Sequence, residues 1–393
     1  MLNAYRGCFS DVPAVAPEFW YYYPAKLLGV DMIEFQREVP FHQALRTAFR
    51  TFQCEGWGVA SARVPNDKVT YSSQDKWLDD DTLEVCCTTR TPRGTLTSTS
   101  RFMRDEPSWR IERPIKDLER DLPAWELVSL GGEPDAMDVS PLISAWEEVG
   151  DVYLLEAGVG TPFFDFFAGA REGGFEIAIY DFMNPDFEPK LHELRDRYIQ
   201  RSIGVARRIC ETTPFESLFI GCSWSCNSLI GPKLWRKWDK PLIEAVAHEV
   251  HHHGRLLHVH FHGKCMETVS DFAEIGVDCV CPFERPPGGD VDGLGGLQEV
   301  ARQLDQRTTM NGNIHTVDTL IRGNQQNVRR EVREVLEAFA DNPRVIIGTG
   351  DQVGRETPEE NLYALVEEAR KGTRRKAVRV EPDASTDGDK PRG

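Results

Sequence analysis

Arg255-Leu-Leu-His-Val-His-Phe-His-Gly263 is a short apolar run that lies between two longer amphipathic stretches. The same alternation continues on both sides of it, from Phe175 to a last amphipathic stretch at 358–371. Apolar runs of about four to eight residues that alternate with amphipathic stretches are typical of βα units in a parallel sheet. The sequence therefore predicts an α/β fold.

Six strands are expected in this regular part, near 176–181, 216–222, 255–261, 277–283, 308–314 and 344–350. The helices between and after them are expected near 187–211, 232–253, 264–275, 293–305, 323–340 and 358–371. Upstream, Val12-Pro-Ala-Val-Ala-Pro17, Trp57-Gly-Val-Ala-Ser-Ala62 and residues 151–158 are further candidate strands. Eight such strands close a (β/α)8 TIM barrel, which is the fold predicted for residues 1–375.

Two segments do not follow the barrel pattern. In residues 83–113, two polar-apolar alternating runs flank the turn Thr91-Pro-Arg-Gly94, which predicts a β-hairpin inserted in the barrel. Residues 376–393 are too polar to pack against a core, so we expect a disordered C-terminal tail there.

The chain carries 63 acidic and 46 basic residues, with a formal net charge of −17. Because phosphate binding needs a basic surface, this charge argues against a nucleic-acid partner. No run approaches the ~18 apolar residues that span a bilayer. Met1-Leu-Asn-Ala-Tyr-Arg6 lacks the apolar core of a signal peptide. We therefore expect a soluble, cytoplasmic protein with no membrane partner.

His258, His260 and His262 recur at period two in the opening stretch. Side chains alternate faces along a strand, so the three imidazoles point the same way. Clustered neutral imidazoles are most often used as metal ligands. The alternative is that one or two of these histidines belong to the core and bond to backbone carbonyls.

The active site of a (β/α) barrel lies at the carboxyl ends of its strands. Four consecutive strands end in polar residues: His260 and His262, Glu284, Asn311 and Asn313, and Asp351. Imidazoles combined with carboxylates suit Zn²⁺, Fe²⁺ or Mn²⁺, so we predict His260, His262, Asp351 and Glu284 as metal ligands. In the alternative interpretation, Glu284 pairs with Arg285 or a helix end, and Asp351 caps the next turn.

Other residues are expected to surround the substrate. The aromatic run Phe19-Trp-Tyr-Tyr-Tyr23 follows the first strand; there Trp20 and Tyr22 either line the pocket or cover the mouth of the barrel. Asn227 lies with Cys222 and Cys226 after another strand, where it helps to shape the pocket. Asn311 is a further predicted substrate contact.

His248-Glu-Val-His-His252 matches H-E-x-x-H, which on a helix gives two zinc ligands and a glutamate base. The motif closes a predicted helix just before Gly254, and histidines in a last turn interact favourably with the helix dipole. It also lies at the opposite end of the barrel from the predicted rim. We therefore interpret it as a solvated helix end, with zinc-protease chemistry as the alternative.

The blocks His260-Phe-His-Gly263, Glu284-Arg-Pro-Pro287, Met310-Asn-Gly-Asn-Ile314 and Gly350-Asp351, in this order, resemble the uroporphyrinogen decarboxylase superfamily. The resemblance extends upstream to Arg6-Gly-Cys-Phe-Ser-Asp-Val-Pro13, and so covers nearly the whole chain. It implies one barrel rather than two domains. The superfamily contains metal-free porphyrinogen decarboxylases and zinc-dependent methyltransferases that work with corrinoid proteins.

Within the superfamily, the decarboxylases carry an R-Q-A-G-R segment after the first strand, where this chain has Phe19-Trp-Tyr-Tyr-Tyr-Pro24. The methyltransferases carry H-x-C in the position of His260-Phe-His262, and a second cysteine in the position of Asp351. The chain is thus nearer to the methyltransferase branch, with both cysteines replaced. Imidazole and carboxylate leave a harder, more Lewis-acidic ion than thiolates do.

The resemblance implies a metal-dependent enzyme that transfers a methyl group to or from a small oxygenated or amine substrate. His260, His262 and Asp351 would be ligands and Glu284 a fourth ligand or proton shuttle; Arg285 and Asn313 would contact the substrate in the catalytic site. The ion is expected to be zinc, with Fe(II) as the alternative. Because the chain lacks a corrinoid-binding D-x-H-x-x-G motif, any corrinoid would be carried by a separate protein.

Two other functions fit the same residues. A metal-dependent lyase, decarboxylase or non-haem iron oxygenase would use the rim for different chemistry, and the replaced cysteines favour this alternative. A non-catalytic barrel that retains only the scaffold is the third, although it does not explain why ligand-type residues gather on one rim.

Overall fold

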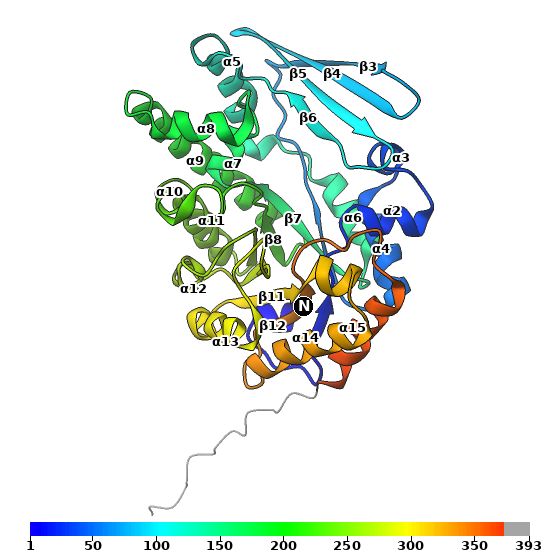
Figure 1. Cartoon of the computed structure of the whole chain (residues 1–393). Helices are drawn as coiled ribbons and strands as arrows, with labels where there is room; N and C mark the ends of the chain where they lie inside the picture. Colours follow the sequence, from blue (N-terminus) through cyan, green and yellow to red (C-terminus); the bar gives the residue numbers. More distant parts are fainter. Residues whose placement is uncertain (373–393) are drawn as a thin grey trace, which may run out of the picture.

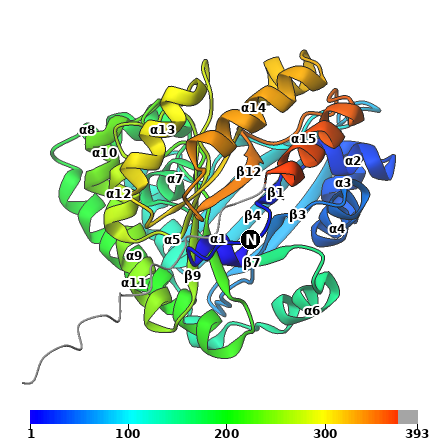
Figure 2. The ribbon, with the colours of Figure 1, turned by 90° about the horizontal axis from the view of Figure 1, so that it is seen from below.

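Eight strands form one curled parallel sheet in the computed structural model, which describes residues 1–372. They are β1 (Ala14–Ala16), β2 (Trp57–Ala60), β7 (Leu154–Gly160), β8 (Ser217–Ile220), β9 (Leu256–Phe261), β10 (Cys279–Pro282), β11 (Thr309–Ile314) and β12 (Val345–Thr349). Their order is β1-β12-β11-β10-β9-β8-β7-β2, and helices surround the sheet (Figure 2). The predicted TIM-barrel fold is confirmed. The predicted tail, 376–393, lies outside the described residues.

The helices are α1 (Leu2–Tyr5), α2 (Tyr22–Leu28), α3 (Met32–Glu38), α4 (Phe41–Phe52), α5 (Leu118–Leu130), α6 (Ser140–Val149), α7 (Phe163–Ala168), α8 (Gly174–Met183), α9 (Glu188–Thr212), α10 (Gly231–Trp238), α11 (Lys240–His252), α12 (Val269–Ile275), α13 (Gly293–Leu304), α14 (Gln325–Ala338) and α15 (Glu359–Lys371). Two short helical turns are η1 (Pro134–Ala136) and η2 (Thr316–Ile321). None of the helices in the described part of the chain has the length and apolarity that crossing a membrane requires.

The strands are buried on both faces, as expected for a parallel sheet covered by helices. Every residue of β8, β10, β11 and β12 is buried. One large apolar cluster lies between the sheet and the helices, and a smaller one gathers inward-facing side chains such as Tyr5, Trp57 and Phe219. This smaller cluster also contains Cys279 and Cys281, so the barrel interior is only partly hydrocarbon.

The two ends of the curled sheet, β1 and β2, meet at a seam. Within residues 1–372 these two strands form no backbone ladder with each other. Instead, the Val15 amide in β1 donates a hydrogen bond of 2.9 Å to the Glu55 carboxylate, just before β2. Strand β1 is therefore hydrogen-bonded as a strand on one side only, to β12.

Helix α1 lies at the amino-terminal end of the barrel strands. Thr309, at the start of β11, donates a side-chain hydrogen bond of 2.8 Å to the carbonyl of Ala4. Arg344, just before β12, donates to the carbonyl of Tyr5. These bonds fix the first turn of the chain beneath the interior, and Figure 2 shows α1 in the middle of that end.

One predicted strand is wrong. Residues 176–181 lie in helix α8, so five βα units rather than six follow β7 in the regular part. The segment contains a central run of four apolar residues, 177–180, between two acidic ones, and so short a run does not distinguish a strand from a helix. A second difference is that the helix predicted at 232–253 is divided at Asp239 into α10 and α11.

The predicted hairpin is confirmed and belongs to a larger sheet. Strands β4 (Thr82–Thr91) and β5 (Gly94–Met103) pair around the expected turn, with Thr91 opposite Gly94. Strands β3 (Thr70–Trp77) and β6 (Trp109–Glu112) flank them and were not predicted. Strand β3 is exposed along its whole length, so it lacks the polar-apolar contrast that reveals a strand in sequence. Figure 1 shows this sheet above α2 and α3.

The helical assignment of α8 can be tested with Tyr180 and Phe182, which would share a face in a strand but not in a helix. Phe182 is 2% exposed and packs against Phe163, Phe164 and Phe167, whereas Tyr180 is 73% exposed. We expect Phe182→Ala to lower the free energy of unfolding by ~3–5 kcal/mol and Tyr180→Ala to change it by less than ~0.5 kcal/mol. Urea denaturation measures both, and equal losses would contradict the helix.

Candidate metal centre and substrate pocket

The histidines of β9 lie in a continuous chain of contacts that leads to the barrel rim. His258 is fully buried, His260 is 8% exposed, and His262 follows the end of the strand. His260 Nε2 lies 2.6 Å from His262 Nε2, and His262 Nδ1 lies 2.6 Å from Glu284 Oε1. Three residues predicted for the site are therefore in direct contact.

The directions of the hydrogen bonds in this series of contacts follow from Glu284, the acceptor at its rim end. A carboxylate only accepts, so His262 Nδ1 donates to Glu284. Burial alone would lower the pKa of His262, but the Glu284 hydrogen bond and the charges of Asp351 and Glu18 raise it to about 9. Burial and the two neighbouring imidazoles lower the pKa of His260 well below its usual value. His262 Nε2 therefore donates to His260 Nε2.

Deeper in the barrel, His258 is the core histidine that the sequence left as an alternative, although its partners are side chains. Its Nδ1 lies 2.8 Å from Glu156 Oε2 and 3.1 Å from the Tyr5 hydroxyl, and its Nε2 lies 3.1 Å from Cys281 Sγ. Burial opposes a charge on His258, but the coulombic effects of Cys279, Glu156 and Cys281 together raise its pKa well above the usual value.

Glu18 is a site residue that the sequence prediction missed. It follows β1 at the rim, is 7% exposed, and within residues 1–372 its carboxyl group makes no hydrogen bond or ion pair. Burial, followed by the charge of Asp351, raises its pKa to about 8. The criterion that selected Glu284 and Asp351, a carboxylate at a strand end, also applies to Glu18 but was used only for the later strands.

Cys281 is the second missed residue. It is paired in register with His260, and its sulfur lies 3.0 Å from His260 Nδ1. Glu18, His260 and Cys281 each offer a ligand atom within 4.8 Å of the other two, which is close enough to share one metal ion. The period-two spacing of Cys279 and Cys281 was the available sequence signal, because it places both thiols on one face.

Asp351 follows β12 and is half-buried at the same rim. Its Oδ1 accepts a hydrogen bond of 2.6 Å from the Gln352 amide. Burial raises its pKa, while His262 opposes the rise. Asp351 thus lies within electrostatic reach of His262, but His260 is the one predicted ligand that belongs to the close group with Glu18 and Cys281.

A pocket of about 300 Å³ adjoins the centre. Glu284 and Asp351 form its inner side, and the rest of the wall consists of Arg285, Pro287, Gly288, His315, Thr316, Val317, Asp318, Arg322 and Gly350. Small-molecule sites occupy clefts of about 300–1,000 Å³. The pocket is thus large enough for a small substrate next to ionisable groups.

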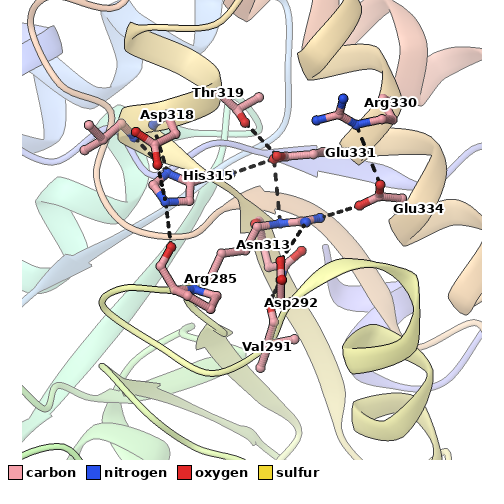
Figure 3. A network of polar contacts seen from close by, with 12 residues as sticks. Arg285, Val291, Asp292, Asn313, His315, Asp318, Thr319, Arg330, Glu331 and Glu334 are labelled. Atoms are coloured by element: carbon pink, nitrogen blue, oxygen red, sulfur yellow. Dashed lines mark hydrogen bonds and ion pairs between the residues drawn. The ribbon is translucent and has the colours of Figure 1, made fainter.

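Arg285 holds the wall of this pocket rather than projecting freely into it (Figure 3). Its Nε donates to the Asn313 carbonyl at 3.2 Å, and its Nη2 lies 2.9 Å from Glu334 in α14. Glu331, from the same helix, accepts from the His315 amide at 2.9 Å and from the Thr319 hydroxyl at 2.6 Å. These contacts tie the η2 turn to α14. A catalytic role for Arg285 stays a prediction.

The predicted asparagines do not line this pocket. Asn313 is fully buried and donates to the Val291 carbonyl, and its Oδ1 has no partner among the described residues. Asn311 is 2% exposed on β11. Asn227 donates to Thr268, and its Oδ1 is likewise unpartnered within residues 1–372. Their substrate contacts stay predictions.

The two predicted aromatic contacts separate in the structure. Trp20 packs against Trp57, with ring centroids 5.5 Å apart, and Trp57 in turn packs against His258 and His260. Tyr22 instead donates a 2.7 Å hydrogen bond to Glu106, between β5 and β6. Trp20 therefore adjoins the centre, whereas Tyr22 points toward the second sheet.

The H-E-x-x-H segment closes α11, as predicted. Glu249 pairs with Arg207 at 2.8 Å and with His253 at 3.2 Å, so its carboxylate is occupied. His251 pairs with Asp278 at 2.8 Å, and this hydrogen bond raises its pKa. His248 and His252, the two histidines of the motif, are exposed, which agrees with a solvated helix end.

A (β/α) barrel with ionisable groups gathered at the carboxyl ends of its strands has the architecture of a barrel enzyme. Residues 188–372 match the family model described as Uroporphyrinogen decarboxylase (URO-D). Over these residues the chain is similar to the uroporphyrinogen decarboxylase family, in agreement with the resemblance of its sequence blocks.

Among solved structures, a methyltransferase from Methanosarcina mazei is similar to this chain. The two share 16% sequence identity with a TM-score of 0.64, over 94% of this chain and 97% of that chain. Another structure, of an uncharacterized protein, has 13% identity and a TM-score of 0.25 over 44% of this chain and 45% of that chain. No curated protein sequence matches. The first similarity shows that the barrel fold extends over nearly the whole chain.

The buried carboxyl group of Glu18 predicts a stability effect in metal-free protein. Since burial raises its pKa from 4.5 to about 8, the folded state holds a proton that the unfolded chain releases, so stability falls as the pH rises across that interval. We expect Glu18→Gln to stabilise the metal-free protein at pH 8 by roughly 1–3 kcal/mol, with little effect near pH 4. Urea titrations at both pH values measure the difference, and destabilisation at pH 8 would contradict it.

Proposed function

We propose that this protein is a metal-dependent enzyme that transfers a methyl group to or from a small oxygenated or amine substrate. The observation that carries the proposal is the gathering of imidazoles and carboxyl groups at the barrel rim, where the buried carboxyl of Glu18 has no partner within residues 1–372. Buried ionisable groups normally need partners, and a divalent cation would supply the missing one.

The side chains present fit such an ion. His260 is kept neutral by burial and by the neighbouring imidazoles, and neutral imidazole is the form that binds metals. Glu18 adds an anionic oxygen, with His262 and Asp351 close behind it. When bound, an ion of this class supplies Lewis acidity that activates a substrate heteroatom.

The other residues have roles that follow from their contacts. Glu284 holds His262 through Nδ1 and also accepts from the Gly263 amide at 3.0 Å, which fixes the imidazole at the rim. Because Glu284 also lines the pocket, it can exchange a proton with a substrate heteroatom there. Trp57 and Phe219 pack against His258 and His260 with edge-on or tilted rings and keep water from the inner side of the centre.

Two further observations support methyl transfer over the alternatives. The similar solved structure is that of a methyltransferase, and the aromatic run Phe19-Trp-Tyr-Tyr-Tyr23 stands where porphyrinogen decarboxylases have their arginine-rich segment. We therefore propose a corrinoid protein as the partner that carries the methyl group. Zinc is the proposed ion, and Fe(II) would instead favour the oxygenase or lyase chemistry.

Metal content tests the proposed centre. Protein purified anaerobically without added metal should contain about one divalent ion per chain by elemental analysis. We expect His260→Ala to lose this ion while the circular dichroism spectrum is retained, because His260 belongs to the close ligand group.

A matched control is the double variant His248→Ala, His252→Ala, which removes two histidines from the end of α11. It should retain the full metal content, since these residues lie in the charged helix end. Loss of metal in this control, or retention in His260→Ala, would contradict the proposed centre.

Methyl transfer can be followed with free methylcobalamin as the carrier. The methyl group leaves cobalt without the bonding electron pair, the acceptor heteroatom loses a proton, and cob(I)alamin remains. We expect zinc-loaded protein to convert methylcobalamin to cob(I)alamin, measured by the visible spectrum, with one or more acceptors from a panel of small alcohols, amines and thiols. Glu284→Gln should slow the reaction by about 100-fold if Glu284 moves the proton. Oxygen consumption by iron-loaded protein without methyl transfer would favour the oxygenase instead.

A further inference from the structure

Cys281 lies at the centre of a buried column of polar side chains. It is 2% exposed on β10, opposite His260 in the strand register. Its sulfur lies 3.0 Å from His260 Nδ1 and 3.1 Å from His258 Nε2. One thiol is thus in contact with two imidazoles inside the barrel.

The column continues below Cys281 into a completely buried acid. His258 Nδ1 lies 2.8 Å from Glu156 Oε2, and Ser217 donates a 2.6 Å hydrogen bond to the other oxygen of Glu156. His258, Glu156 and Ser217 are all 0% exposed. A carboxylate in contact with one ring nitrogen fixes the orientation of an imidazole and directs the other nitrogen at its target, which here is the sulfur.

The sulfur is contacted from both directions along the column. From the rim it is met by His260 Nδ1, and from below by Nε2 of His258, whose Nδ1 faces Glu156. Ligand atoms of Glu18, His260 and Cys281 all lie within 4.8 Å of one another, which is close enough for one ion to be shared by the three. Burial raises the pKa of the Cys281 thiol to about 12, so binding of the ion would release the thiol proton.

We propose that Cys281 is a thiolate ligand of the ion, together with His260 and Glu18, and that the Glu156–His258 pair positions its sulfur. This inference rests on the metal centre proposed above but not on methyl transfer. In the superfamily resemblance, the positions of the two cysteines are occupied here by His262 and Asp351. The structure offers a sulfur from a different strand instead.

The ligand set defines the class of ion. One sulfur, one imidazole nitrogen and one carboxylate oxygen favour Zn²⁺, Co²⁺ or Fe²⁺, while Mg²⁺ and Ca²⁺ prefer oxygen ligands alone. The centre is therefore softer than a set built from His260, His262, Asp351 and Glu284, because a thiolate donates charge to the ion.

Cobalt substitution tests the sulfur directly. We expect Co²⁺-loaded protein to show an intense thiolate-to-cobalt charge-transfer band in the near ultraviolet, and Cys281→Ser to lose it. Cys279→Ser is the matched control, because Cys279 is equally buried one period deeper on the same strand, and it should retain the band. X-ray absorption of zinc-loaded wild-type protein should show one sulfur at ~2.3 Å, a result that does not depend on how well a variant folds.

The positioning pair needs its own test. We expect Glu156→Gln to raise the dissociation constant for Co²⁺ by about 10–100-fold and to shift the charge-transfer band. Asp239→Asn, which changes another fully buried acid outside the column, should leave both unchanged. An unchanged constant and band in Glu156→Gln would remove the positioning role.

These experiments distinguish failure of the thiolate assignment from failure of the proposed methyl transfer. A zinc site with nitrogen and oxygen ligands alone would overturn the thiolate assignment even if methyl transfer is observed. A zinc–sulfur bond without methyl transfer would support the thiolate and leave the proposed function as the part that fails.

Discussion

The structure depends on how the barrel satisfies the polar groups that its strands direct inward. Parallel strands covered by helices have no aqueous face, so each inward polar side chain needs a partner within the protein. Here the partners are other inward side chains: Glu156 meets His258, His258 meets Cys281, and Cys281 meets His260. The register of β9 against β10, which sets His260 opposite Cys281, therefore determines both the packing of the interior and the chemistry of the rim.

Charge at the rim is unbalanced in a way that packing alone does not explain. Glu18 and Asp351 are both held at raised pKa values by burial, and each is also close to other acidic groups. His262 offsets part of this charge through Glu284. A cation would stabilise these acids in their ionised form. The same buried carboxyl groups that destabilise the metal-free site would therefore favour binding of the ion.

Much of the fold was predictable because its signals are local. Short apolar runs correctly indicated five barrel strands in the regular part of the sequence and two strands upstream of it. The candidate at 151–158 indicated the eighth. Residues 176–181 were misassigned because apolar residues on several sides of a short helix give no period to read. Strand β3 was missed for the opposite reason, since both of its faces are exposed.

The candidate site was predictable only in part. His260, His262 and Glu284 could be grouped from sequence because neighbouring parallel strands bring their carboxyl ends together. Glu18 lies more than two hundred residues away from them, and its place beside them depends on β1 pairing with β12 across the closing barrel. Cys281 could be placed beside His260 only from the register of β10 against β9. The family resemblance pointed to the positions of His262 and Asp351, where relatives carry cysteine. The sulfur that this chain offers is that of Cys281, on a different strand.

The seam between β1 and β2 has a consequence for the ion that this centre would hold. Glu18 follows the strand that is hydrogen-bonded on one side only, whereas His260 and Cys281 belong to strands paired on both sides. Two of the proposed ligand atoms thus lie on strands that have a neighbour on each side. The third lies on a segment held by two single hydrogen bonds, from the Glu18 amide to the Thr349 hydroxyl and from the Val353 amide to the Glu18 carbonyl. In the proposed centre the carboxylate of Glu18 would therefore be the ligand whose place depends least on the strand ladder, whereas the nitrogen of His260 and the sulfur of Cys281 would be fixed by the register of β9 and β10.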